Sequence, residues 1–195
     1  DLLDEHKDTM LGDYLNSIHY ADKALGKFIK DLKAQGLYDE SLIAIYGDHF
    51  AIPNSSKEVI DLMNDFIGKK YNYDVIMNIP LIITCPGSEI GNTNKKVGSH
   101  IDFMPTILNL LGVKNNKGLM FGVDLNNYED YNNVKAQTIM RKGSFIDEDV
   151  IFIISATEVF DDCIAELRSD YSQTDIYKYR DIYEQIIKEI NLSNY

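Results

Sequence analysis

The sequence predicts an α/β fold, and three observations support this prediction. Apolar side chains in residues 12–35 recur at alternating spacings of four and three, which is typical of an amphipathic helix. Residues 42–46 form a continuous apolar run, as expected for a buried strand. Beyond residue 118, two apolar runs at 135–141 and 149–155 precede a helical pattern, which predicts a small antiparallel β subdomain and a C-terminal helix.

The first part of the chain reads as helices alternating with strands. The stripe of the first helix ends at Gly36, and the order helix, short loop, strand is that of half a βαβ unit. Further elements are expected as a helix over 59–67, strands at 79–84 and 97–101, and a helix over 102–112 with Pro105 in its first turn. A polar loop at 115–118 is the expected boundary between a core of residues 1–117 and a second part of residues 118–195.

Composition excludes several classes of protein. With 45% hydrophobic and 26% charged residues, the chain can bury a core and is not expected to be disordered. A net charge of −12 argues against binding nucleic acid or an anionic bilayer by charge alone. Cys85 and Cys163 are far apart and are expected to be free thiols. No run of 18 apolar residues is present, so any membrane anchor would lie outside this sequence.

The tripeptide Gly47-Asp48-His49 is the strongest functional signal in the sequence. It follows the apolar run directly, and chemistry in open α/β sheets lies at the carboxyl ends of strands. Aspartate and neutral imidazole are both metal ligands, so Asp48 and His49 could hold two positions of one divalent cation. Two ligands do not complete a catalytic site, and no nucleophile motif lies nearby.

The other histidines are weaker candidates. His100 is a rival candidate ligand, although packing at the end of a strand is the simpler interpretation. His19 lies beside the apolar stripe of the long helix, where a packing role is expected, and His6 lies in a charged segment that should be exposed.

Several further side chains are expected to be structural. Asp102 precedes a helix and should cap its free N–H groups. Thr106 lies inside that helix and is not a candidate nucleophile, and Arg141 is expected to form a surface ion pair. Aromatic clusters can bind sugars or sit at a membrane interface, but helical spacing favours a partly buried core face for Tyr177, Tyr179 and Tyr183.

Several segments of the sequence together carry one resemblance. They are Gly47-Asp-His49, Asp102-x-x-Pro-Thr106, Tyr14-Leu-Asn-Ser-Ile-His-Tyr-Ala-Asp22, Leu25-Gly-Lys-Phe28, Ile79-Pro-Leu81, Met120-Phe-Gly-Val-Asp-Leu125 and Gly143-Ser-Phe-Ile146. Together they resemble the lipoteichoic acid synthase type of the sulfatase/alkaline phosphatase superfamily. The first two elements are typical of the whole superfamily, whereas the element at residues 14–22 narrows the resemblance to phosphoglycerol transferases.

The resemblance implies an alkaline phosphatase-like sheet with flanking helices and a specific activity. Family members are anchored in the cell membrane with the enzyme domain outside, and they move glycerol phosphate from phosphatidylglycerol onto a cell-wall polymer or a glycolipid. They use a threonine nucleophile and a divalent cation, usually manganese or magnesium. Asp48 and His49 match the family's metal ligands, whereas the nucleophile and the residues that bind glycerol phosphate have no matching position. The resemblance therefore implies the C-terminal part of the enzyme domain, inactive by itself.

Two alternatives remain open. The chain could belong to a sulfatase or a phosphomonoesterase or phosphodiesterase of the same superfamily, or to a non-catalytic domain that keeps the fold. The sequence opens with Asp1 and runs into a helix with no preceding strand, which suggests a start partway through a domain. An incomplete sheet would leave a strand edge uncovered, so self-association is also expected.

Overall fold

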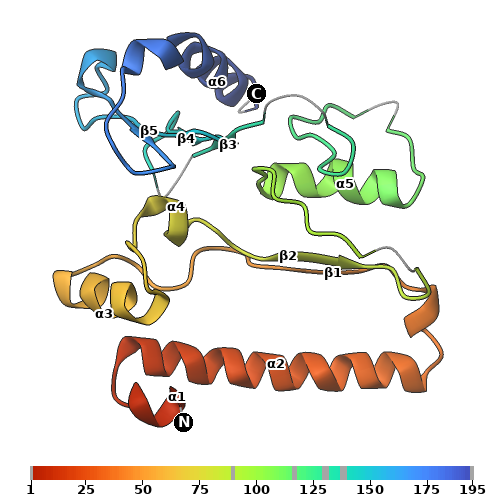
Figure 1. Cartoon of the computed structure of the whole chain (residues 1–195). Helices are drawn as coiled ribbons and strands as arrows, with labels where there is room; N and C mark the ends of the chain where they lie inside the picture. Colours follow the sequence, from red (N-terminus) through yellow and green to blue (C-terminus); the bar gives the residue numbers. More distant parts are fainter. Residues whose placement is uncertain (1, 89–90, 116–117, 129–131, 137–139, 194–195) are drawn as a thin grey trace. The chain divides into compact units, whose positions relative to one another are not determined.

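The described residues form two compact units. The computed structural model describes residues 2–88, 91–115, 118–128, 132–136 and 140–193, and these divide into Asp1–Gly91 and Asn92–Tyr195 (Figure 1). The division lies upstream of the boundary predicted at residues 115–118, of which 116 and 117 lie outside the described residues. The observed division differs from the predicted one because the helix that contains Thr106 is hydrogen-bonded to the loop that follows it. The Thr106 hydroxyl accepts a hydrogen bond from the Leu125 N–H at 3.0 Å.

The first unit contains a long helix, a two-stranded sheet and several short helices. In chain order these are α1 (Leu2–Glu5), α2 (Met10–Ala34), the 3₁₀ turn η1 (Tyr38–Glu40), β1 (Ile43–Tyr46), α3 (Lys57–Ile67), α4 (Tyr73–Ile76) and β2 (Leu81–Thr84). The two longer helices confirm the predicted ones. The Thr9 side chain caps α2 by accepting from the Gly12 N–H, and Ser56 caps α3 in the same way through Val59. Gly68 ends α3 with φ 68°, a left-handed conformation that favours glycine.

The strands β1 and β2 pair antiparallel and form a two-stranded ribbon. Ile43 lies opposite Thr84, and Tyr46 lies opposite Leu81. Figure 1 shows the reason: α3 and α4 lie beyond the end at which the chain leaves β1, so the chain enters β2 from that same end. A parallel pair would need a crossover back to the other end of the ribbon.

Apolar side chains along α2 and the β1–β2 ribbon are less buried than predicted. In the predicted helical stripe, Ile18 and Phe28 are 48% and 52% exposed, and within the predicted buried strand only Ile43 is buried. Apolar residues occupy both faces of the ribbon, as in a strand buried on both sides. The described residues of this unit are too few to cover both faces of the β1–β2 ribbon and the apolar stripe of α2.

The second unit is built around a four-stranded antiparallel sheet. Its elements are the 3₁₀ turn η2 (His100–Asp102), α5 (Phe103–Leu110), β3 (Val134–Lys135), β4 (Phe145–Ile146), β5 (Val150–Ile153), the 3₁₀ turn η3 (Phe160–Asp162), β6 (Ile164–Leu167), the 3₁₀ turn η4 (Ile176–Tyr179) and α6 (Arg180–Ser193). The strand order is β3-β4-β5-β6, and every neighbouring pair is antiparallel. The predicted antiparallel subdomain and closing helix are therefore confirmed.

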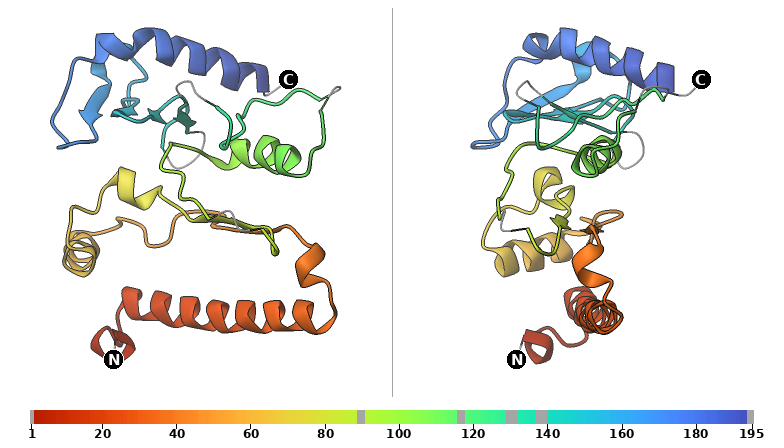
Figure 2. Two further views of the ribbon diagram at one scale, coloured as in Figure 1. Left: turned by 45° about the vertical axis from the view of Figure 1, so that its right-hand side comes forward. Right: turned by 90° about the vertical axis from the view of Figure 1, so that its right-hand side faces the viewer.

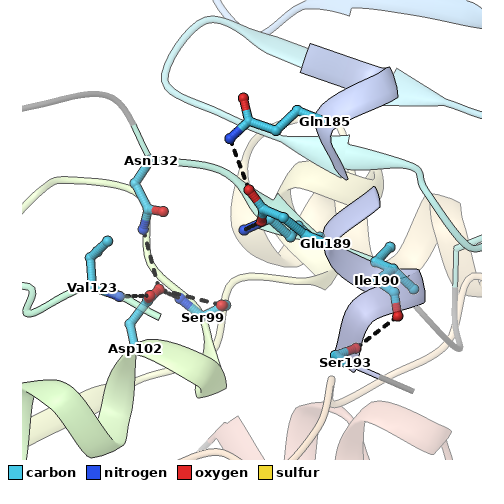
Figure 3. A network of polar contacts seen from close by, with 9 residues as sticks. Ser99, Asp102, Val123, Asn132, Gln185, Glu189, Ile190 and Ser193 are labelled. Atoms are coloured by element: carbon cyan, nitrogen blue, oxygen red, sulfur yellow. Dashed lines mark hydrogen bonds and ion pairs between the residues drawn. The ribbon is translucent and has the colours of Figure 1, made fainter. Parts of the chain in front are cut away.

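Helix α6 packs across the sheet and closes the core of this unit (Figure 2). Its buried Ile186 and Ile190 join Phe145 and Phe152, whose rings stack at 5.0 Å. At its edge, the Lys135 ammonium lies 2.8 Å from Glu189, which also accepts a hydrogen bond from Gln185 (Figure 3). Burial raises the pKa of Glu189, but the hydrogen bonds from Lys135 and Gln185 outweigh it, and the pKa falls below its ordinary value.

The strand predictions in this unit were only partly right. The run at 149–155 corresponds to β5. Strands β4 and β6 were not predicted, because β4 has only two residues and Glu166 interrupts the apolar run of β6. Of the run at 135–141, Lys135 ends β3, and residues 137–139 lie outside the described residues. The short strand predicted at 97–101 was wrong, since the chain there turns into η2.

Candidate metal centre

The Asp48-His49 pair lies in the loop that leaves β1. The Gly47 N–H donates to the Pro80 carbonyl at 3.0 Å and extends the pairing with the neighbouring strand by one residue. A Cβ at Gly47 would lie 3.0 Å from Ile79 Cβ and 3.4 Å from Pro80 Cδ. Glycine at this position therefore allows close packing where the chain leaves the sheet, and the next two side chains are released into the loop.

Both side chains of the pair are exposed and close together. The side chain of Asp48 is 85% exposed and that of His49 is 67% exposed, and His49 Nε2 lies 3.7 Å from Asp48 Oδ1. His49 Nδ1 lies 2.6 Å from the Phe50 carbonyl oxygen. Because a carbonyl can only accept, Nδ1 carries the proton of the neutral ring, and Nε2 keeps the lone pair that a metal requires.

This arrangement fits a shared cation. Metal–ligand bonds to imidazole nitrogen and carboxylate oxygen are about 2.0–2.2 Å long, and two of them can span the separation of these atoms. The Phe50 carbonyl provides the outer hydrogen bond that orients most metal-binding imidazoles. No sequence signal identifies this partner, because it is a backbone atom. No group of three or more His, Cys, Asp or Glu side chains within the described ranges is placed to hold a metal ion. The pair would therefore supply only part of a coordination shell.

The other histidines lie in other segments of the chain. His19 is exposed on α2, where a packing role was expected, and His100 is exposed at the start of η2. His6 was expected in solvent, but it is half-buried and its ring meets Phe66 edge-on at 5.5 Å. Arg141 is exposed.

Asp102 is a fully buried structural residue, although its predicted role was wrong in detail. It does not cap α5 with its side chain. Its Oδ2 accepts from the Ser99 N–H at 2.7 Å and from the Asn132 amide at 3.2 Å, and its Oδ1 accepts from the Val123 N–H at 2.8 Å (Figure 3). The carboxylate points away from the first turn of α5 because it closes a capping box around η2.

Thr106 adds two hydrogen bonds to the same network. Its hydroxyl donates to the Asp102 carbonyl at 2.6 Å and accepts from the Leu125 N–H at 3.0 Å. The Asp-x-x-Pro-Thr element thus joins η2 and α5 to residues 123–125. The hydroxyl of Thr106 is buried and engaged, in line with its exclusion as a nucleophile.

The tyrosine cluster is mostly a core face. Tyr179 and Tyr183 are half-buried and pack against the core of the second unit, as predicted. Tyr177 is 56% exposed, which was not predicted, and its hydroxyl donates to Asp161 at 2.9 Å. The guanidinium of Arg180 lies over the Phe160 ring at 4.2 Å.

The cysteines are free, Cys85 exposed and Cys163 buried.

Comparisons with known proteins agree on one family. A family model described as Sulfatase matches residues 3–113. Lipoteichoic acid synthase 1 of Bacillus subtilis is 37% identical over 142 residues, covering 71% of this chain and 21% of the relative. Lipoteichoic acid synthase of Staphylococcus aureus is 34% identical over 149 residues, covering 75% of this chain and 22% of the relative. The chain thus spans about a fifth of the length of these relatives.

A solved structure supports the same assignment. The crystal structure of the lipoteichoic acid synthase LtaP from Listeria monocytogenes matches with a TM-score of 0.79 and 32% identity, over 97% of this chain and 47% of that one. The alkaline phosphatase-like α/β fold implied by the sequence resemblance is therefore confirmed. Since the family model covers more than half of the sequence, the chain belongs to the sulfatase family and is of the lipoteichoic acid synthase type.

Proposed function

We propose that this chain is part of a metal-dependent phosphoglycerol transferase that moves glycerol phosphate from phosphatidylglycerol to a polymer or glycolipid. The observation that carries the proposal is the Asp48-His49 pair, held 3.7 Å apart on the loop after β1 in a chain of the sulfatase family. The similar relatives are lipoteichoic acid synthases, which supports this substrate class.

The chain's own contribution is to bind and orient a divalent cation. Asp48 offers a negative charge, and His49 offers Nε2, because the Phe50 carbonyl holds the proton on Nδ1. A bound cation would offset charge on the phosphoryl oxygens and lower the pKa of a nucleophilic hydroxyl. Magnesium prefers an all-oxygen shell, so a mixed nitrogen and oxygen set favours manganese of the two.

The remaining parts of the machinery are expected outside this chain. A threonine nucleophile would form the covalent intermediate that splits one displacement into two steps. Within the part of the chain that the structure describes, no helix is both long enough and apolar enough to span a membrane. We propose an enzyme domain on the outer face of the cell membrane, with its anchor and nucleophile elsewhere in the protein.

A turnover assay tests this function. A longer protein that contains this chain together with an upstream threonine should release diacylglycerol from a fluorescent phosphatidylglycerol analogue when manganese is added. The 195-residue chain alone should give only background, because it supplies metal ligands and no nucleophile. Robust turnover by the chain alone, or hydrolysis of a sulfate ester in preference to the lipid, would refute the proposal. The second result would favour the sulfatase alternative, which the name of the matching family supports.

We also propose that a second copy of the chain covers the exposed β1–β2 ribbon. Ile82 is 56% exposed and Tyr46 is 49% exposed on this two-stranded sheet. Among the described residues, each of the two strands also has one edge without a neighbouring strand, and such edges promote strand pairing between molecules. Analytical ultracentrifugation should show a concentration-dependent dimer, which Ile82→Lys should weaken by placing a charge on the ribbon. Leu119→Lys is the matched control, since Leu119 is 76% exposed in the other unit and should leave association unchanged. A chain that stays monomeric at all concentrations would rule this out.

A further inference from the structure

The loop that carries Asp48 and His49 is anchored in a buried apolar cluster. Ile52 is 2% exposed and packs with Leu11, Met63, Tyr71 and Ile76. The ring of Phe50 packs against the same cluster. Two of the three residues after His49 are therefore held by the core of the first unit, although His49 itself is exposed.

Tyr71 is the polar link in this anchor. It is 6% exposed, and its hydroxyl donates a short hydrogen bond to the Ile52 carbonyl. Its backbone N–H donates to Asn64 Oδ1 on α3 at 2.7 Å, which fixes the position of Tyr71 itself. Burial raises the pKa of Tyr71, so the phenol keeps the proton that it donates.

Backbone geometry connects this anchor to His49. The Phe50 carbonyl, which receives the Nδ1 proton of His49, lies only two peptide groups before the Ile52 carbonyl. With the side chains of Phe50 and Ile52 packed and the Ile52 carbonyl held, few backbone rotations remain that could turn the Phe50 carbonyl away. Without the phenol hydroxyl, the Ile52 carbonyl would be buried with an unmet hydrogen bond, and the loop would gain by rotating it towards water.

We propose that Tyr71 is a positioning residue for the metal centre. By holding the Ile52 carbonyl, it keeps the Phe50 carbonyl on His49 Nδ1 and leaves His49 Nε2 available to a cation. This inference rests on the proposed metal-binding function of Asp48 and His49. Tyr71 touches neither ligand, and it acts through the backbone of residues 50–52.

The test is Tyr71→Phe in the full 195-residue chain, which removes the hydroxyl and keeps the ring in the cluster. The chain has four histidines, so long-range ¹H–¹⁵N spectra can resolve each imidazole. At pH 8.5, where an ordinary imidazole is neutral, His49 should be the Nδ1–H tautomer in the parent chain and a mixture of tautomers in the variant. Line broadening of His49 by added Mn²⁺ should require roughly tenfold more Mn²⁺, as is common for changes outside the ligand shell.

Two matched controls separate positioning from general stability. Tyr14→Phe makes the same change in a tyrosine that packs against the same cluster. Tyr128→Phe removes a hydroxyl that donates to the Val97 carbonyl at 3.0 Å in the other unit, so it loses a comparable bond. Both controls should leave the His49 tautomer and its Mn²⁺ response unchanged, even where they lower the melting temperature.

Each outcome supports or overturns the inference. If Tyr71→Phe lowers the melting temperature as Tyr128→Phe does but leaves the His49 tautomer and Mn²⁺ broadening unchanged, Tyr71 has no positioning role. If Tyr71→Phe does not fold, Asn64→Ala decides, because it releases the Tyr71 backbone and should shift the same two readouts to a smaller degree. If the parent chain shows no Mn²⁺ broadening at His49, the metal function fails, whereas a tautomer shift in Tyr71→Phe would still establish the positioning contact.

Discussion

Replacing Asp48 or His49 with alanine is expected to weaken manganese binding by at least about tenfold, because loss of a ligand should cost no less than loss of an outer-shell partner. Asp48 supplies the charge, and His49 supplies the nitrogen whose lone pair the Phe50 carbonyl leaves available. Because both side chains are largely exposed, neither change should disturb the fold. The loss can be measured from the free Mn²⁺ signal in electron paramagnetic resonance titrations, with circular dichroism as a check on folding.

Matched controls lie in the same unit. His19→Ala and Asp39→Ala remove an exposed imidazole and an exposed carboxylate from α2 and η1, and both should bind manganese like the parent chain. Asp48→Asn should give an intermediate affinity, because it keeps an oxygen donor and removes the charge. Equal affinity in the parent chain, Asp48→Ala and His49→Ala would remove the basis of the proposed metal centre and favour a non-catalytic domain.

The second large effect is expected from Asp102→Ala, which should destabilise the second unit by at least about 3 kcal/mol. The carboxylate is fully buried and accepts from the backbone N–H groups of Ser99 and Val123 and from the Asn132 amide. Each buried donor left without an acceptor costs about 1–3 kcal/mol. Urea unfolding followed by circular dichroism measures the loss, and amide hydrogen exchange should show reduced protection at Val123.

Two further variants test the cause of that loss. Asp102→Asn keeps the shape but turns one oxygen into a donor that faces other donors, so it should also be strongly destabilising. Asp170→Ala removes an exposed carboxylate that accepts hydrogen bonds from Ser172, and it should have a much smaller effect. A loss of less than about 1 kcal/mol for Asp102→Ala would mean that water replaces the carboxylate at little cost, and that the network does not hold η2 to residue 123.

Local patterns predicted the helices well. The stripe of α2 and its end at Gly36 are local signals, since helical periodicity and left-handed turns depend on a few neighbouring residues. The closing helix α6 was predicted for the same reason. Pairing of β1 with β2 was not predictable, because 34 residues separate Tyr46 from Leu81 and nothing in either strand states the direction of its partner.

The residues of the candidate site were also predictable only where the signal in the sequence is local. The Gly47-Asp48-His49 signal identified the two side chains, since a strand followed by a glycine and two ligand-type residues is a local pattern. The hydrogen bond from Val123 to Asp102, the edge-on contact of His6 with Phe66 and the exposure of Tyr177 all depended on residues distant in the sequence. Tyr71 carried no signal at all, because its partner is a backbone carbonyl 19 residues away.

By itself, then, the sequence determined the positions of the longer helices, which side chains could bind a cation, and the family to which the chain belongs. Only the tertiary structure decided how β1 and β2 pair, which carbonyl orients His49, and that Asp102 ties η2 to the loop at Val123. The physical reason is that periodicity and capping act between neighbours along the chain. Strand direction and buried hydrogen bonds depend instead on how distant segments pack around a shared core.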